Sequence, residues 1–146
     1  MSPRGRVRDT YVAALQHDLI ELDGTERLIG VVRRPMPWLA AAVDENLPAL
    51  GPPVALLAEF KDCHAELAET MSDAAAHNAA FEAVDYRERY EEHLESDPDA
   101  RDALDTLRAA LDGGETLVLV CYENTEEKRC HRTILRDRLA QSGSED

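Results

Sequence analysis

The sequence predicts one α/β domain over residues 1–140, with a small, mostly parallel sheet flanked by helices, followed by a flexible tail at residues 141–146. Short aliphatic runs, such as residues 28–32 and 116–122, have the length and continuity of buried strands. Longer stretches repeat apolar residues at helical spacing. A chain of 146 residues is long enough to bury one core. These three observations favour helices packed on a sheet.

The first third of the chain contains two predicted strands. Residues 7–15 begin as a strand, although Ala13–Leu15 fits the start of a short helix equally well. The run at residues 28–32 predicts a second strand, which the prolines directly after it would end. Residues 38–43 are apolar but show no regular period, so we expect irregular structure with Trp38 in the core.

The middle of the chain predicts three helical segments. One begins at Val54 with Pro53 in its first turn, and another begins after Ser72, a residue that favours the N-cap position. The apolar stripe shifts near Asp85, which predicts a break there. Ser96-Asp97-Pro98 opens the next helix, and a Gly-Gly pair closes it. A strand over residues 116–122 and a helix over residues 130–140 complete the domain.

Charge and composition narrow the classes of function. The net charge of −14 disfavours generic attraction to nucleic acid or to an anionic membrane. Only Lys61 and Lys128 are lysines, and acidic residues occur throughout the predicted helices. This composition is typical of adaptation to high salt, although an ordinary acidic surface is the alternative.

The apolar runs are too short to cross a bilayer, and no apolar segment follows the basic N-terminus. We therefore expect a cytoplasmic protein without a membrane segment. In that compartment the three cysteines would be mostly reduced. The sequence identifies no cofactor and leaves the oligomeric state open.

The segment from Thr116 to Arg132 concentrates reactive residue types. A predicted strand ends in Cys121, a polar loop containing Glu123 follows, and Cys130-His131-Arg132 opens the last helix. Since ligands bind at the carboxyl ends of strands in open α/β sheets, we expect a site here. Arg129, in the loop, and Arg33 and Arg34, after an earlier strand, would bring positive charge to it.

The chain resembles the family known as domain of unknown function 488. The resemblance rests on Val31-Val32-Arg33-Arg34-Pro35, on the spacing of Phe81, Tyr86, Tyr90 and Leu94, and on Cys121-x-Glu123-x6-Cys130-His131-Arg132. It covers roughly residues 28–139. Some branches of the family carry Asn-His-Ala in place of Cys-His-Arg. The resemblance implies a compact α/β fold and no particular activity.

We consider four interpretations of this cluster. The first is a site for a small anionic ligand, such as a phosphate- or nucleotide-like molecule, bound by Arg33, Arg34, Arg129 and Arg132 at a helix N-terminus. The second is a thiol-dependent redox or sulfur-transfer enzyme, with Cys121, Cys130, His131 and Glu123 as the catalytic residues. The third is a metal site, which the spacing disfavours, and the last is a structural cluster in a non-enzymatic interaction module.

Two histidines elsewhere have less specific surroundings. His77, near the start of its predicted helix, fits a surface or capping role better than a place in a pocket. His64 lies on the apolar stripe of the helix that begins at Val54, where a core histidine is the simpler interpretation.

Overall fold

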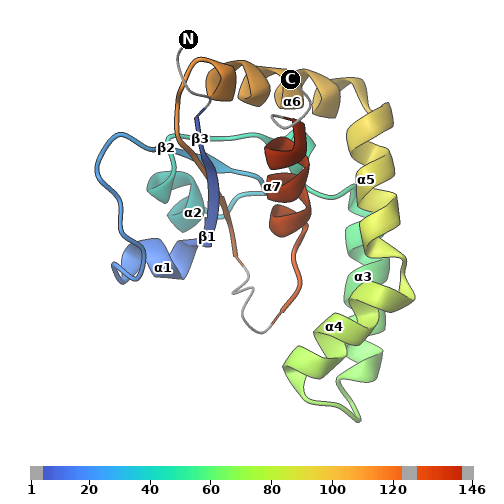
Figure 1. Cartoon of the computed structure of the whole chain (residues 1–146). Helices are drawn as coiled ribbons and strands as arrows, with labels where there is room; N and C mark the ends of the chain where they lie inside the picture. The colour runs from blue at the N-terminus through green and yellow to red at the C-terminus, as the bar shows by residue number, and fades with distance from the viewer. Residues whose placement is uncertain (1–4, 123–127, 143–146) are drawn as a thin grey trace.

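The computed structural model describes residues 5–122 and 128–142, and within them it confirms the predicted α/β class. Four strands form one all-parallel sheet in the order β1-β4-β2-β3. Figure 1 shows the sheet between a layer of short helices and a layer of longer ones. The strands are β1 (Val7–Tyr11), β2 (Arg27–Gly30), β3 (Glu45–Asn46) and β4 (Leu117–Cys121).

Seven α-helices and one short 3₁₀ helix accompany the strands in the described residues. They are α1 (Val12–Gln16), α2 (Pro37–Ala42), the 3₁₀ helix η1 (Pro48–Leu50), α3 (Val54–Leu67), α4 (Asp73–Ala83), α5 (Tyr86–Ser96), α6 (Pro98–Asp112) and α7 (His131–Ser142). None of these helices has the length and apolar character needed to span a membrane.

The central strand is β4, which pairs with β1 on one side and β2 on the other. All five of its residues are buried. Leu117 and Leu119 belong to the core on one face of the sheet, whereas Val118 and Val120 belong to the core on the other. Burial on both faces explains why the strand is a continuous apolar run rather than an alternating one.

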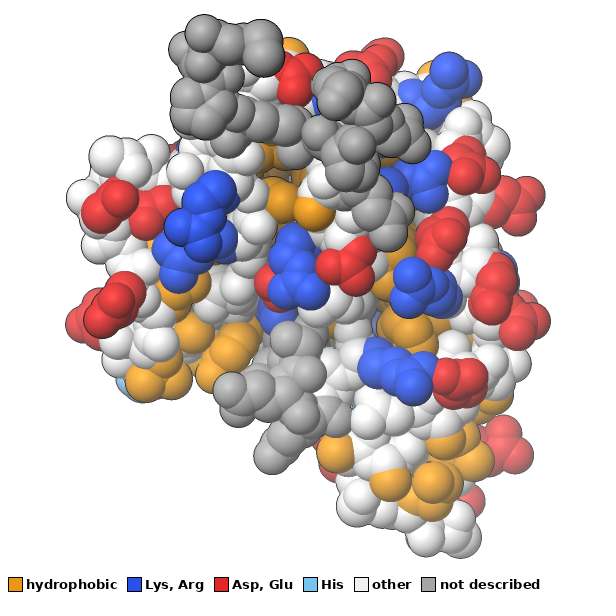
Figure 2. All heavy atoms as spheres, viewed as in Figure 1, with side chains coloured by type: hydrophobic (Ala, Val, Ile, Leu, Met, Phe, Trp, Pro, Cys, Tyr) orange, Lys and Arg blue, Asp and Glu red, His pale blue; other side chains and the backbone are white. Residues whose placement is uncertain are grey.

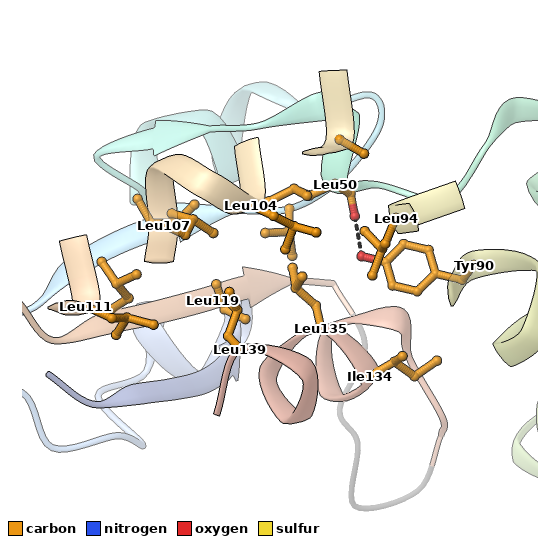
Figure 3. Close-up of a cluster of buried hydrophobic side chains, with 14 of the residues drawn as sticks. Leu50, Tyr90, Leu94, Leu104, Leu107, Leu111, Leu119, Ile134, Leu135 and Leu139 are labelled. Atoms are coloured by element: carbon orange, nitrogen blue, oxygen red, sulfur yellow. Dashed lines mark hydrogen bonds between the residues drawn. The ribbon is translucent and has the colours of Figure 1, made fainter. Parts of the chain in front are cut away.

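The larger core lies under α5, α6 and α7 (Figure 3). Leucines from these helices pack on the sheet, and the fully buried Tyr90 donates a hydrogen bond of 2.6 Å to the Leu50 carbonyl oxygen. α3 and α4 pack against each other and project past the carboxyl edge of the sheet (Figure 1). That projection makes one wall of the pocket described below.

The opposite face is covered by α1 and α2, and here one prediction is wrong. Residues 37–42 form a regular helix with Pro37 in its first turn, where irregular structure was expected. Trp38 is 45% exposed instead of lying in the core, because Leu39 is the residue of this helix that turns inward. Its ring packs edge-on against Tyr122, with the ring centroids 5.0 Å apart.

Local signals fixed several boundaries correctly. Ser72 accepts a hydrogen bond from the Ala75 N–H, and Asp97 accepts one from the Ala100 N–H, as N-caps do. Asp85 adopts the left-handed conformation, with φ 53°, and separates α4 from α5 where the break was predicted. Other ends differ from the prediction: β1 stops at Tyr11, directly before α1, and β2 stops at Gly30 rather than at residue 32. β3 was not expected, and α7 continues to Ser142, beyond the predicted end at residue 140.

Candidate functional site

A cavity of about 420 Å³ opens at the carboxyl ends of β2 and β4. Its walls come from the segment after β2, from α3 and α4, and from the start of α7. Much of the surface is apolar or aromatic, and Phe60, Phe81 and Tyr86 contribute rings. This is the edge of a parallel sheet at which a ligand site was expected.

The charge of the cavity is opposite to that of the whole chain. Among the described residues that line it are Arg33, Arg34, Lys61 and Arg129, and none of these lining residues is an aspartate or glutamate. The chain as a whole carries a net charge of −14. Cationic side chains therefore gather at this concave surface of an otherwise acidic protein.

Outside the cavity, basic side chains are mostly paired with acidic ones. Figure 2 shows Lys and Arg side chains beside Asp and Glu side chains on the face that carries α5 and α7. Arg138 of α7 pairs with Glu95 of α5 at 2.8 Å, for example. Each such surface pair contributes little to the stability of the fold. The pairs account for most arginines outside the cavity, so no ligand is needed to explain them.

Two free thiols meet at the inner end of the cavity. Cys121 is the last residue of β4, and Cys130 directly precedes α7. Their Sγ atoms lie 2.9 Å apart, although nine residues separate them in the chain. Cys121 is 1% exposed and Cys130 is 5% exposed, and both line the cavity.

His131 is oriented by the backbone beside these sulfurs. Its Nε2 lies 2.5 Å from the carbonyl oxygen of Val31, which can only accept, so Nε2 carries the proton. The other ring nitrogen, Nδ1, therefore has a free lone pair and lies 3.4 Å from the Cys130 Sγ atom. Burial lowers the pKa of His131, which keeps the ring neutral at neutral pH and able to accept a proton.

Arg132 turns away from the cavity and toward β1. Its Nε donates to Asp9 Oδ2 at 2.8 Å, and its Nη1 donates to the Thr10 carbonyl oxygen at 2.5 Å. The same Nη1 lies 3.3 Å from Cys121 Sγ. Burial, followed by the hydrogen bond with Cys130, raises the pKa of the Cys121 thiol well above its usual value, so Cys121 is protonated at neutral pH.

The three cavity arginines are held differently. Arg33 is half-buried and donates to the carbonyl oxygens of Pro52, at 3.1 Å, and Gly51, at 2.9 Å. Arg34 is exposed and its guanidinium forms no ion pair with any described residue. Arg129 forms an ion pair with Glu82, and its guanidinium lies 6.0 Å from the centre of the Phe81 ring.

Most of the predicted site residues come together. Arg33, Arg34, Cys121, Arg129, Cys130 and His131 all line one cavity. Arg132 contacts the sulfur of Cys121 from outside the lining. Glu123 lies outside the described residues.

Sequence reasoning missed two contributors to this site. His77 is 5% exposed, lines the cavity and lies with its Nε2 2.7 Å from the Arg129 carbonyl oxygen, so its predicted surface or capping role is wrong. His77 lies four residues before Phe81, so both side chains are on one face of α4. That spacing could have indicated that His77 faces inward. Asp9, which holds Arg132, carried no signal because it lies more than a hundred residues away in sequence.

Metal binding finds no support in the described residues, which contain no group of three His, Cys, Asp or Glu side chains arranged to hold an ion. The sulfurs and His131 instead contact one another and the backbone. The chemistry that this arrangement offers is that of a cysteine with a neighbouring base and a second thiol.

Comparison with known proteins identifies one family. Residues 11–143 match the model of DUF488-N3a, described as the active DUF488-N3 subclade. The match begins at the last residue of β1 and covers β2, β3, β4, the residues that line the cavity and the Cys-His-Arg segment. No curated protein and no solved structure matches the chain.

Proposed function

We propose that this chain, which belongs to the DUF488-N3a family, is a thiol-dependent enzyme that reduces a sulfur–sulfur bond in a small anionic substrate. One observation carries the proposal: two free sulfurs 2.9 Å apart share a cavity that is lined by four cationic side chains and, among the described residues, by no carboxylate. The description of the family as an active subclade is consistent with an enzyme.

The anionic character of the substrate follows from the rim of the cavity. Arg34 presents an exposed guanidinium there, and Arg33, which also lines the cavity, is fixed by two backbone carbonyls. Guanidinium groups bind carboxylate, phosphate and sulfonate oxygens with paired hydrogen bonds. The apolar walls suit the uncharged body of such a molecule.

Cys130 is the better nucleophile of the two thiols. It is the more exposed one, it lies at the N-terminal end of α7, and the unprotonated Nδ1 of His131 lies within reach of its proton. A helix N-terminus and a neighbouring base both favour the thiolate. Cys121, kept as a thiol, donates its hydrogen bond to the Cys130 sulfur and stabilises it further.

The proposed reaction proceeds in two thiol–disulfide exchanges. Cys130 gives its proton to His131 Nδ1 and attacks one substrate sulfur, and the other substrate sulfur leaves with the electron pair of the broken bond and the proton from His131. Cys121 then attacks Cys130 Sγ, and the bound substrate sulfur leaves with the Cys121 proton. The substrate gains two electrons and two protons, and the enzyme is left with a Cys121–Cys130 disulfide.

The distance between the sulfurs suits this last step. A disulfide bond measures about 2.05 Å, so the two sulfurs need to approach by less than ~1 Å from their 2.9 Å separation. An external small thiol compound returns the pair to the reduced state by the reverse exchange. No other part of the described chain has to supply electrons.

The second candidate is a non-enzymatic interaction module in which the cysteines only fill space. The deep burial of Cys121 favours it, since buried cysteine behaves as a small apolar residue. The two candidates differ in what the sulfurs do in solution. A packing role predicts thiols that do not react until the protein unfolds.

The test uses 5,5′-dithiobis(2-nitrobenzoate), a small anionic disulfide that releases a coloured thiolate. In a Cys63→Ser background, native protein should release two equivalents of the coloured thiolate and keep no reagent bound. The second equivalent is released when Cys121 attacks the Cys130 adduct and the internal disulfide forms. Adding Cys121→Ser should give one equivalent and leave one covalent adduct on Cys130. A native chain that releases less than a tenth of an equivalent, but two after denaturation, would support the packing role and refute the enzyme.

We also propose that the acidic surface is an adaptation to high salt. The support is compositional: the net charge is −14, and arginine almost wholly replaces lysine. Carboxylates crowded on a small domain repel one another, and salt screens that repulsion. The proposal is independent of the thiol chemistry.

A further inference from the structure

We propose that Arg132, positioned by Asp9, is a catalytic residue that stabilises the Cys121 thiolate when it leaves during reduction of the Cys121–Cys130 disulfide. This role rests on the proposed function. It assigns Arg132 to the reacting sulfur rather than to the anionic substrate.

The contacts of Arg132 point to the sulfur and away from the cavity. The side chain is 2% exposed, and its Nη1 reaches both the Thr10 carbonyl oxygen and Cys121 Sγ, the latter at 3.3 Å. The cavity lining does not include it. A substrate anion in the cavity therefore meets Arg33, Arg34 and Arg129, whereas the guanidinium of Arg132 meets the sulfur.

Asp9 fixes this geometry from β1. Its Oδ2 accepts from Arg132 Nε at 2.8 Å, while its Oδ1 pairs with Arg136. The pair with Asp9 holds the buried guanidinium in place, so that its Nη1 lies next to Cys121, where it can donate to a negative sulfur.

The chemistry needs such a charge at this point. When an external thiolate attacks Cys130 Sγ, the disulfide bond breaks and its electron pair goes to Cys121 Sγ. Exchange is faster when the leaving sulfur is a more stable thiolate. At a sulfur that is 1% exposed, water solvates the thiolate poorly, and the N–H of Arg132 supplies a hydrogen bond in its place.

Other groups near this sulfur act in different directions. Arg132 and His131 of α7 lower the pKa of Cys121, whereas burial and Cys130 raise it. Tyr90 of α5 interacts electrostatically with both sulfurs, Arg33 interacts with Tyr90 and His131, and Asp9 acts through Arg132. Among the described residues, Arg132 is the cation whose guanidinium nitrogen lies within hydrogen-bond distance of this sulfur.

The experiment measures how fast dithiothreitol reduces the Cys121–Cys130 disulfide in full-length protein carrying Cys63→Ser. Arg132→Gln should slow reduction about tenfold to a hundredfold, which is the factor that one charge-assisted hydrogen bond supplies. Asp9→Asn should slow it less. Arg136→Gln is the matched control, since Arg136 pairs with Asp9 without contacting Cys121, and its rate should stay within about twofold of the parent.

A second readout separates chemistry from folding. In a Cys63→Ser, Cys130→Ser background, the ultraviolet absorbance of the Cys121 thiolate should appear at higher pH after Arg132→Lys than with Arg132, because lysine lacks the planar fork. Equal reduction rates and equal thiolate titrations in all variants would overturn the role of Arg132. A parent protein that never forms the disulfide would overturn the proposed function itself.

Discussion

The pairing of His131 with Val31 allows its structural and chemical roles to be separated by two substitutions. In His131→Gln, the amide nitrogen can take the place of the imidazole Nε2 and donate to the Val31 carbonyl oxygen, but nothing replaces the basic Nδ1. In His131→Ala, both the donor and the base are lost. The two variants should therefore differ in stability and agree in reactivity.

The expected magnitudes follow from burial. Val31 is 0% exposed, so its carbonyl oxygen has no access to water when the histidine donor is removed. An unsatisfied buried acceptor costs about 1–3 kcal/mol, and the cavity left by the ring against Tyr90 adds about 1 kcal/mol more. His131→Ala should then lose about 2–4 kcal/mol, and His131→Gln only about 1 kcal/mol.

Two assays measure these changes on the same samples. Urea unfolding at neutral pH gives the free energy of unfolding, and the rate of release from 5,5′-dithiobis(2-nitrobenzoate) gives the reactivity of Cys130. Both variants should react at least about tenfold more slowly than the parent, at the low end for loss of a general base. A His131→Gln variant that is stable and reacts at the parent rate would refute the role of Nδ1.

Further predictions address the cavity, the pH dependence and the surface. Gly51→Ala places a Cβ 2.3 Å from the Arg33 backbone nitrogen, so it should cost about 1–3 kcal/mol of stability. It should also weaken the binding of inorganic phosphate measured by calorimetry. An unchanged stability and an unchanged phosphate affinity would contradict the close approach of the two backbones. Arg34→Gln should weaken the same phosphate binding about threefold to thirtyfold, whereas Arg101→Gln, which removes an exposed charge of α6, should not. Because burial lowers the pKa of His131, unfolded chains bind its proton first on acidification, so stability should fall below pH ~6.5 by up to about 1.4 kcal/mol per pH unit; His131→Gln should remove that part of the slope, and an identical slope would argue against it. Dialysis into low salt should lower the thermal midpoint, and a midpoint independent of salt would exclude the salt adaptation.

Local sequence signals predicted most of the fold. The uninterrupted run of β4 predicted a strand buried on both faces, and Ser72 and Asp97 marked helix starts by their capping chemistry. The same reasoning failed for residues 37–42, because a helix of six residues is too short to show a helical period of apolar residues. β3 is shorter still, with two residues, and leaves no detectable pattern.

The candidate site was predictable where topology alone fixes it. Cys121 is the last residue of β4 and Cys130 directly precedes α7. Because ligand sites of open α/β sheets lie at the carboxyl ends of the strands, both cysteines were expected at that edge of the sheet. Which way each side chain points was not predictable. Arg132 follows His131 directly, yet it faces β1 while the histidine faces Val31, because successive helical residues diverge by about 100°.

The most direct test compares two methanethiosulfonate reagents of the same kind, one ending in a sulfonate and one in a trimethylammonium group. The account predicts that Cys130 reacts at least about tenfold faster with the anionic reagent, because the cavity concentrates anions near the thiol. Cys63, outside the cavity lining on a chain of net charge −14, should prefer the cationic reagent. Peptide mass spectrometry after timed labelling resolves the two cysteines. Equal rates at Cys130, or the preference for the cation expected at Cys63, would contradict an anion-binding thiol site.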